Sequence, residues 1–303
     1  MTRIVAHLII GDRPEPFLPS LLASMAPAVT LLVVNDNSGL GRAGSPHERV
    51  LAESAFGREG RLRITHTRFE DFSSARNVCF ELDPDADEQT WIAFVDADEV
   101  HGEPFARIAA RLDALPRDIA YVDGYTWHFF QTFDWYASIE RRMSFFRWTP
   151  QARWEGKVHE QLTGVPGKRL ALPYVYAHYG HVVPFQWAAR KGLQYSSLGG
   201  PGTPLDEEAA LRADFAGDYR VVDRYFADWW ARLIPFRGEH PPKARPLIDE
   251  IKRERGEHFR RVEEIIRRHQ GPLVRMRNAV RALNYAQRWR LRAISALRYG
   301  FTC

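Results

Sequence analysis

The segment WIAFVDADE, residues 91–99, decides the fold class. Its first five residues are apolar and predict a buried strand, because short continuous apolar runs are typical of strands at the centre of a parallel sheet. Asp96 and Asp98 follow this strand directly. Open α/β folds bind their ligands beyond the carboxyl ends of the strands. Two neighbouring carboxylates at such an edge suit Mn²⁺ or Mg²⁺, which usually joins the protein to substrate phosphates.

The same spacing of aspartates occurs twice more, at Asp83-Pro84-Asp85 and at Asp85-Ala86-Asp87. No apolar strand leads into these segments, and proline interrupts them, so we interpret them as a solvated loop. The D-x-D spacing alone therefore does not identify the candidate metal ligands. Asp96 and Asp98 are chosen because an apolar strand precedes them.

Strands and helices alternate through the first 130 residues, which predicts βαβ units and an α/β fold with a mostly parallel sheet. The expected strands are 4–10, 30–35, 61–67, 91–95 and 119–130, and the expected helices are 17–25, 73–82 and 103–115. Asp71, Ser73 or Ser74 is the expected N-cap of the second helix.

After residue 130 the pattern becomes irregular and rich in aromatic residues, and then mainly helical. Further helices are expected at 184–198, 206–233, 247–269 and 273–297. We therefore expect a catalytic domain over residues 1–200 and a helical C-terminal region over 201–303.

Composition is that of a soluble globular protein, with 45% hydrophobic and 26% charged residues among 303. The charge is uneven, because residues 243–303 hold 16 Lys and Arg against 6 Asp and Glu. The rest of the chain is mildly acidic, which argues against a nucleic-acid groove through the whole protein. With two cysteines, Cys79 and Cys303, we expect no structural disulfide and a reducing, cytoplasmic compartment.

Two further polar segments mark candidate binding residues. In FSSARN, residues 72–77, Arg76 lies early in an expected helix, where a guanidinium is useful if it faces a phosphate or a base. A solvated arginine is the alternative. In VNDNS, residues 34–38, Asp36 ends a predicted strand and can accept hydrogen bonds from a base or ribose. A simple Asx turn is the alternative.

Together, the early strand, VNDNS, FSSARN and WIAFVDADE resemble the family 2 glycosyltransferases with the GT-A fold, over roughly residues 3–200. The resemblance implies a Rossmann-like mixed sheet, a nucleotide-diphospho-sugar donor and an inverting direct displacement. It implies that Asp36 contacts the nucleoside, that Arg76 contacts the base or phosphates, and that Asp96 and Asp98 bind ribose and metal. Asp98 is thereby also a catalytic candidate.

The first strand departs from this family. It ends in Ile10-Gly11-Asp12-Arg13, where the family usually has a polar Asn-Glu pair. Ile10 is the residue that we place beside the nucleotide at this position.

A second likeness lies in Trp154-Glu155-Gly156-Lys157-Val158-His159-Glu160, which resembles a branch of the family with a W-x-G-x-V-H-E segment. An inverting transferase needs a base for the acceptor proton. Glu160 is the candidate, and Glu155 and Asp134 are alternatives. The branch has a later histidine near a glycine, here His178, which we expect as a further metal ligand unless it is a structural histidine.

The segment 271–303 contains seven arginines and no acidic residue, mixed with Leu and Val at roughly helical spacing. Such a helix can lie on an anionic membrane surface, at the inner face of the membrane. Alternatively, it docks on the acidic body of the same protein with its arginines solvated. The expected partners are otherwise a nucleotide-sugar donor and a glycan, lipid-linked, peptide or small-molecule acceptor, without nucleic acid.

Three other functions compete with glycosyl transfer. The strand followed by Asp96 and Asp98 also resembles the nucleophile motif of haloacid-dehalogenase-like phosphatases, with Gly217-Asp218 and Asp223 as the late acidic motif. That motif normally opens its chain, whereas here two strand units precede it. A nucleotidyltransferase would need a glycine-rich basic loop after strand one, and Gly11-Asp12-Arg13 is a poor version. The last alternative is a non-catalytic module that binds a sugar nucleotide.

Overall fold

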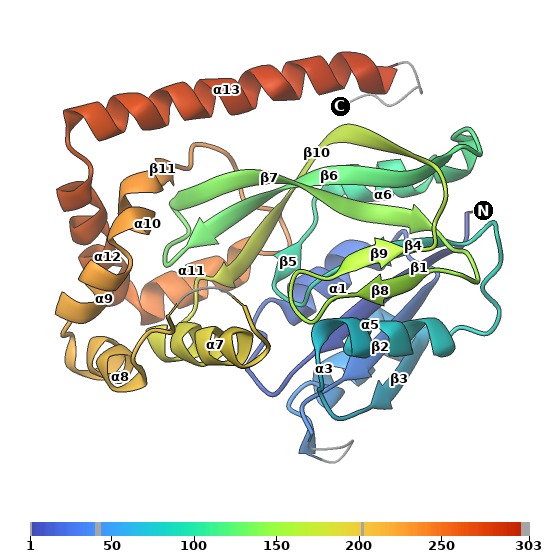
Figure 1. Ribbon diagram of the computed structural model, residues 1–303, viewed down its shortest axis with the longest axis horizontal. Helices are drawn as coiled ribbons and strands as arrows, with labels where there is room; N and C mark the ends of the chain where they lie inside the picture. Colours follow the sequence, from blue (N-terminus) through green and yellow to red (C-terminus); the bar gives the residue numbers. More distant parts are fainter. Residues whose placement is uncertain (1, 40–43, 201–202, 298–303) are drawn as a thin grey trace. The chain divides into compact units, whose positions relative to one another are not determined.

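The computed structural model describes residues 2–39, 44–200 and 203–297, with only the backbone described for 286–296 (Figure 1). The chain forms two compact units. Unit 1 comprises Met1–Tyr125, Arg141–Tyr176 and Arg292–Cys303, and unit 2 comprises Thr126–Glu140 and Ala177–Leu291. Each unit combines separate stretches of the sequence, so it cannot be matched to one continuous segment. The expected domain boundary near residue 200 stays a prediction.

Unit 1 contains a group of parallel strands in the order β3-β2-β1-β4. They are β1 (Ile4–Ile10), β2 (Leu31–Asp36), β3 (Leu62–His66) and β4 (Trp91–Phe94). The next strand, β7 (Trp135–Arg147), runs antiparallel to β4. The predicted α/β class with a mixed sheet is therefore confirmed.

The remaining strands continue the same sheet or form a small second one. The large sheet continues from β7 through β6 (Ile119–Phe130) and β10 (Lys168–His181) to β5 (Glu99–Val100), and β11 (Ile234–Pro235) pairs with β7. A separate antiparallel pair joins β8 (Arg153–Glu155) to β9 (Gln161–Thr163).

Alternating side chains of the parallel strands face two different cores, as the two-residue period of a strand requires. On β1, Ile4, Ala6, Leu8 and Ile10 belong to one core, and Val5 belongs to the other. The strands β1, β2 and β4 are thus buried on both faces, which explains why they are apolar at nearly every position, whereas the edge strand β3 is only partly buried. Because of this burial on both faces, these strands could be predicted from continuous apolar runs in the sequence.

The helices of unit 1 pack against these two faces. They are α1 (Leu18–Met25), α3 (Glu48–Glu53), α4 (Ala55–Arg58), α5 (Phe72–Glu81), α6 (Glu103–Ala109) and a 3₁₀ helix (Leu112–Ala114). Asp71 is the N-cap of α5, since its carboxylate accepts a hydrogen bond from the Ser74 amide. One of the three predicted caps is thereby confirmed.

Unit 2 is mainly helical and has its own core, which includes Phe185, Phe226, Trp230, Val262 and Ile266. Its helices are α7 (Phe185–Ser197), α8 (Glu207–Ala216), α9 (Arg220–Tyr225), α10 (Ala227–Arg232), α11 (Arg245–Glu254), α12 (Gly256–His269) and the greater part of α13 (Pro272–Leu297).

The helices expected over 206–233 and 247–269 are each divided in the structure. The first is interrupted at Gly217, which takes a left-handed conformation (φ +66°) that glycine adopts without steric cost.

Among the described residues, no helix has the length and apolar composition needed to cross a bilayer.

His7 gives unit 1 a pH-dependent stability. Burial, assisted by Arg76, lowers the pKa of this imidazole to about 3, and neither ring nitrogen has a hydrogen-bond partner among the described residues. The unfolded chain binds a proton near pH 6.5 that the folded protein excludes, so stability is present above pH 6.5 and falls as the pH falls toward 3.

We therefore expect His7→Phe to flatten the pH dependence of stability. Between about pH 7.5 and about pH 5, the wild-type protein should lose about 2 kcal/mol more unfolding free energy than the variant. Urea unfolding at both pH values measures this difference. An unchanged pH dependence would show that His7 is not the responsible group.

Candidate active site

Asp96 and Asp98 lie just beyond the carboxyl end of β4, in a tight turn that leads into β5. The Glu99 amide donates to the Asp96 carbonyl at 3.0 Å, and the Asp96 amide donates to the Glu99 carboxylate at 3.1 Å. The turn brings carboxylate oxygens of Asp96 and Asp98 within 4.8 Å of each other. Two ligands of one Mg²⁺ can stand up to about 4.2 Å apart, so small side-chain rotations would let both bind one ion.

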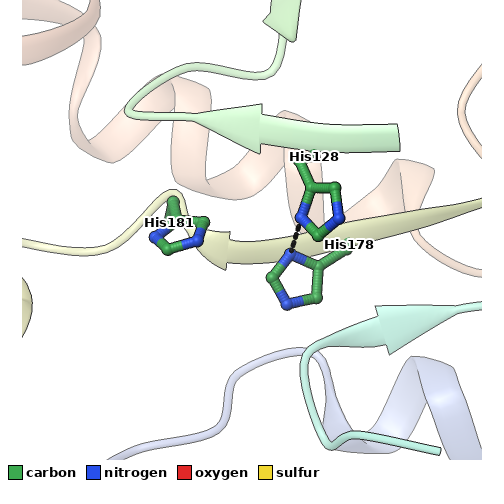
Figure 2. A group of neighbouring side chains, drawn as sticks. All are labelled: His128, His178 and His181. Carbon is green, nitrogen blue, oxygen red and sulfur yellow. Dashed lines mark hydrogen bonds between the residues drawn. The ribbon is translucent and has the colours of Figure 1, made fainter. Parts of the chain in front are cut away.

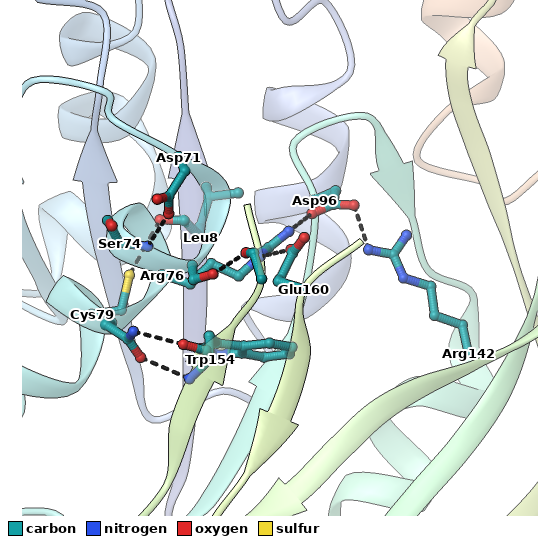
Figure 3. Close-up of polar contacts among 12 residues, drawn as sticks. Leu8, Asp71, Ser74, Arg76, Cys79, Asp96, Arg142, Trp154 and Glu160 are labelled. Carbon is teal, nitrogen blue, oxygen red and sulfur yellow. Dashed lines mark hydrogen bonds and ion pairs between the residues drawn. The ribbon is translucent and has the colours of Figure 1, made fainter. Parts of the chain in front are cut away.

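Three arginines surround this pair of carboxylates. Arg76 Nη2 lies 2.8 Å from Asp96 Oδ1, and Arg142 is paired with the other oxygen of Asp96. Arg13 Nη2 lies 3.0 Å from Asp98 Oδ2. Figure 3 shows Arg76 and Arg142 reaching Asp96 from opposite sides. The sequence predicted Arg76, but it gave no indication for Arg142 and treated Arg13 only as part of an atypical loop.

The Arg76 guanidinium is buried against two aromatic rings. Its central carbon lies 4.2 Å from the ring centre of Phe94 and 5.6 Å from that of Trp154. Its Nε atom donates to Glu160 Oε1 at 2.5 Å. Arg76 therefore joins Glu160 to Asp96, two residues that lie far apart in the sequence. Its predicted contact with a base or phosphate stays a prediction.

The FSSARN segment explains how Arg76 reaches this position. On α5, Asn77 Nδ2 donates to the Trp154 carbonyl at 3.0 Å, and the Trp154 amide donates to Asn77 Oδ1 at 2.8 Å. Ser73 donates to the Gly156 carbonyl. These bonds fasten α5 to β8 and the loop after it, and Gly156 adopts φ +99° there, which favours glycine. The sequence analysis considered Ser73 only as an N-cap candidate and assigned no role to Asn77.

Burial and the arginines act in opposite directions on the carboxylates. Burial alone raises the pKa of Asp96, but Arg142 and Arg76 outweigh it and hold the pKa well below its usual value. Burial also raises the pKa of Glu99, to about 8, against the attraction of Arg142, whose Nη1 lies 2.6 Å away. Asp96 is therefore ionised near pH 7.

Carboxylates outnumber guanidiniums at the site. Besides Glu99, the carboxylates of the cluster are those of Asp96, Asp98, Glu160 and Glu15, the last of which pairs with Arg13 at 2.5 Å. Four carboxylates face the three guanidiniums of Arg13, Arg76 and Arg142. This excess, built from hard oxygen ligands, fits a divalent cation such as Mn²⁺ or Mg²⁺.

Asp36 ends β2 at the same edge of the parallel strands, since β2, β1 and β4 run in the same direction. Its Oδ1 accepts from the Ser38 amide at 2.8 Å, which is the Asx turn that the sequence left as an alternative. Its buried Oδ2 lies 3.8 Å from His66 Nε2 and has no hydrogen-bond partner within the described part of the chain. Because the Asp36 side chain is fully buried, its predicted contact with a nucleoside stays a prediction.

Ile10 is placed less favourably for a side-chain role. Its side chain is buried in the core, and its carbonyl accepts from the Asn37 amide at 2.7 Å. Its predicted place beside the nucleotide stays a prediction.

The three candidate bases have different surroundings. Glu160 is mostly buried and bound to Arg76. Glu155 is exposed and accepts from the Thr163 hydroxyl at 3.1 Å. Asp134 belongs to unit 2, where it pairs with Lys252 at 2.7 Å. In unit 1, Glu160 is therefore the candidate that shares the aspartate cluster.

His178 belongs to unit 2, where it lies with His128 and His181 (Figure 2). The Nδ1 atoms of His128 and His178 are 3.1 Å apart, and each of the three rings offers a nitrogen within 4.8 Å of the others. Because His178 and Asp98 belong to different units, the prediction that His178 joins the aspartates at a metal stays a prediction.

No protein-family model matches the sequence, and no curated protein matches it. Among solved structures, the chain is similar to S. aureus TarS 1-349, with a TM-score of 0.38 and 11% identity over 89% of this chain and 93% of that one. It is also similar to a mycobacterial protein, with a TM-score of 0.29 and 13% identity over 41% of each chain. Because these TM-scores are low, the functional argument depends on the residues of this chain.

The cluster makes Arg76 a structural residue, whatever its ligand contacts. Arg76→Met leaves Glu160 and one oxygen of Asp96 buried without their ion-pair partner, so we expect the unfolding free energy to fall by about 3–5 kcal/mol. Urea unfolding near pH 7 measures the loss. Adding Glu160→Gln should restore part of it, since one stranded charge is then removed.

A matched control is Arg49→Met, which breaks the exposed Arg49–Glu53 pair. Exposed pairs contribute at most about 1 kcal/mol, so little should change. Equal losses for Arg76→Met and Arg49→Met would contradict a buried, cooperative charge cluster.

Proposed function

We propose that this chain is a metal-dependent, inverting glycosyltransferase of the GT-A type that uses a nucleotide-sugar donor. One observation carries the proposal: Asp96 and Asp98 share a cluster with Arg13, Arg76 and Arg142 beyond the carboxyl end of a central parallel strand. Carboxylates for a cation and guanidiniums for phosphate oxygens are the groups that a leaving nucleoside diphosphate needs.

Asp96 and Asp98 would hold the cation, and a bound Mn²⁺ or Mg²⁺ would neutralise charge on the departing diphosphate. The arginines are already concentrated at this position, so a diphosphate can replace carboxylate oxygens as their partner. Asp36, at the same edge, would accept a hydrogen bond from the base or ribose. Asp96 stays ionised throughout, because Arg142 and Arg76 keep its pKa low.

Glu160 would act as the general base. In a single displacement, the acceptor oxygen bonds to the anomeric carbon while the bond to the diphosphate breaks, and Glu160 takes the acceptor proton. Arg76 links Glu160 to Asp96, so the same side chain positions the base and the metal ligand. A diphosphate that draws Arg76 away would leave the Glu160 carboxylate free to accept the proton.

The phosphatase alternative receives less support from the structure. The proposed late acidic residues have other partners in unit 2. Asp218 pairs with Arg220 at 2.8 Å, and Asp223 pairs with His269 at 2.6 Å.

The expected compartment is the cytoplasm. Cys79 is a free, buried thiol, and burial raises its pKa to about 12, so it stays protonated and unreactive. The acceptor class that we propose remains broad: a glycan, a lipid-linked sugar, a peptide or a small molecule.

Nucleotide binding should depend on metal and on Asp98. In a thermal-shift panel of UDP, GDP, dTDP and CDP, one nucleotide should raise the melting temperature with Mn²⁺, by about 2–4 °C for each kcal/mol of binding. Asp98→Asn should abolish the metal-dependent part of that rise.

A matched control is Asp87→Asn, in the Asp85-Ala86-Asp87 segment. The Asp87 carboxylate accepts hydrogen bonds from the Gln89 amide and the Thr90 hydroxyl of its own turn. This variant should retain the full shift. A metal-dependent shift that survives in Asp98→Asn, or no shift with any nucleotide, would contradict the proposed site. Release of phosphate from phosphomonoesters without release of nucleoside diphosphate would favour the phosphatase.

Glu160→Gln should separate chemistry from donor binding. Gln retains an oxygen for Arg76 but cannot take a proton, so transfer should slow by about 10²–10⁴-fold while the metal-dependent nucleotide shift persists. Rates of nucleoside diphosphate release with and without acceptor measure this effect. Glu155→Gln is the matching test of the second carboxylate. A greater loss of transfer rate in Glu155→Gln than in Glu160→Gln would identify Glu155 as the general base.

A further inference from the structure

Helix α13 contacts the rest of unit 2 through its polar side. Asn278 is only 2% exposed, and its Nδ2 donates to the carbonyls of Ala231 and Leu233 at 3.0 Å each. Arg281 donates to the carbonyls of Arg232 and Ala137 at 2.9 Å. Several of these carbonyls end α10 and have no partner within that helix, so α13 caps α10 with side-chain donors.

The opposite side of α13 is apolar and faces solvent. Leu273, Met276, Val280 and Leu283 are 76%, 63%, 52% and 64% exposed. They are spaced by three, four and three residues, which places them on one face of the helix, here named the apolar row. A helix on a globular protein normally turns its apolar stripe toward the core. The part of α13 in unit 2 therefore turns its polar side toward its neighbours, which is the reverse of this usual orientation.

The charge around the apolar row indicates which partner covers it. Arg275 and Arg277 are exposed on the same stretch, and residues 271–303 include seven arginines and no acidic residue. A second copy of this helix would bring arginines against arginines, which is unfavourable. An anionic surface with an apolar interior satisfies both features, because it accepts the row and attracts the arginines.

We propose that α13 binds in the plane of an anionic lipid bilayer, with the apolar row at the level of the acyl chains and the arginines among the headgroups. This inference goes beyond the proposed function, since it concerns neither the nucleotide nor the aspartates. It also agrees with the absence of a membrane-spanning helix among the described residues, because an in-plane helix does not cross the bilayer.

The test is co-sedimentation of the full chain with vesicles, without nucleotide or acceptor, so that its outcome is independent of catalysis. The protein should bind vesicles that contain phosphatidylglycerol and should bind pure phosphatidylcholine vesicles much more weakly. The double variant Leu273→Ser/Met276→Ser should bind the anionic vesicles at least about tenfold more weakly. Arg275→Gln should reduce binding to the anionic vesicles, as should high salt.

A matched control is Phe215→Ser on α8, which removes an apolar side chain that is 77% exposed elsewhere on unit 2. It should bind like the wild-type protein, and circular dichroism confirms that each variant is folded. Absence of vesicle binding, or equal binding by the double variant, overturns the proposal. A dimer in light scattering that Leu273→Ser/Met276→Ser dissolves also overturns it, because a second copy then covers the row.

Discussion

The ion-pair chain from Glu160 through Arg76 to Asp96 and Arg142 is the interaction on which the site depends. A buried carboxylate is costly unless a positive charge and hydrogen bonds accompany it. Arg76 supplies the positive charge and the hydrogen bonds for two carboxylates, Asp96 and Glu160, and its guanidinium lies over the Phe94 ring. The geometry of the aspartate turn is therefore tied to a helix and a loop that are distant in sequence.

That tie depends on a second layer of hydrogen bonds. Asn77 forms a reciprocal pair with the backbone of Trp154, so α5 and β8 are held together as two strands would be. Asn35, on β2, donates to the Ala75 carbonyl and fixes the other side of α5. Both asparagines act through α5, which suggests that the FSSARN segment is a framework for the placement of one guanidinium.

Helix α13 shows a different constraint in unit 2. Its donors satisfy the carbonyls at the end of α10, and this requirement turns Asn278 and Arg281 inward. The apolar row must then face outward, because it occupies the opposite side of the same helix. Hydrogen-bond satisfaction, rather than apolar burial, thus decided the orientation of this helix.

The sequence by itself determined the central strands β1, β2 and β4, the α/β class and the candidate aspartates, because these doubly buried strands are mainly apolar and Asp96 follows one of them. It also identified Asp36 at the end of a strand and Arg76 early in a helix, and the resemblance to a family segment identified Glu160. Only the tertiary structure brought Arg13 and Arg142 to the aspartates, raised the pKa of Glu99 and turned the polar side of α13 inward. These features depend on contacts between residues that are distant in sequence. Such contacts cannot be predicted from local patterns of hydrophobicity.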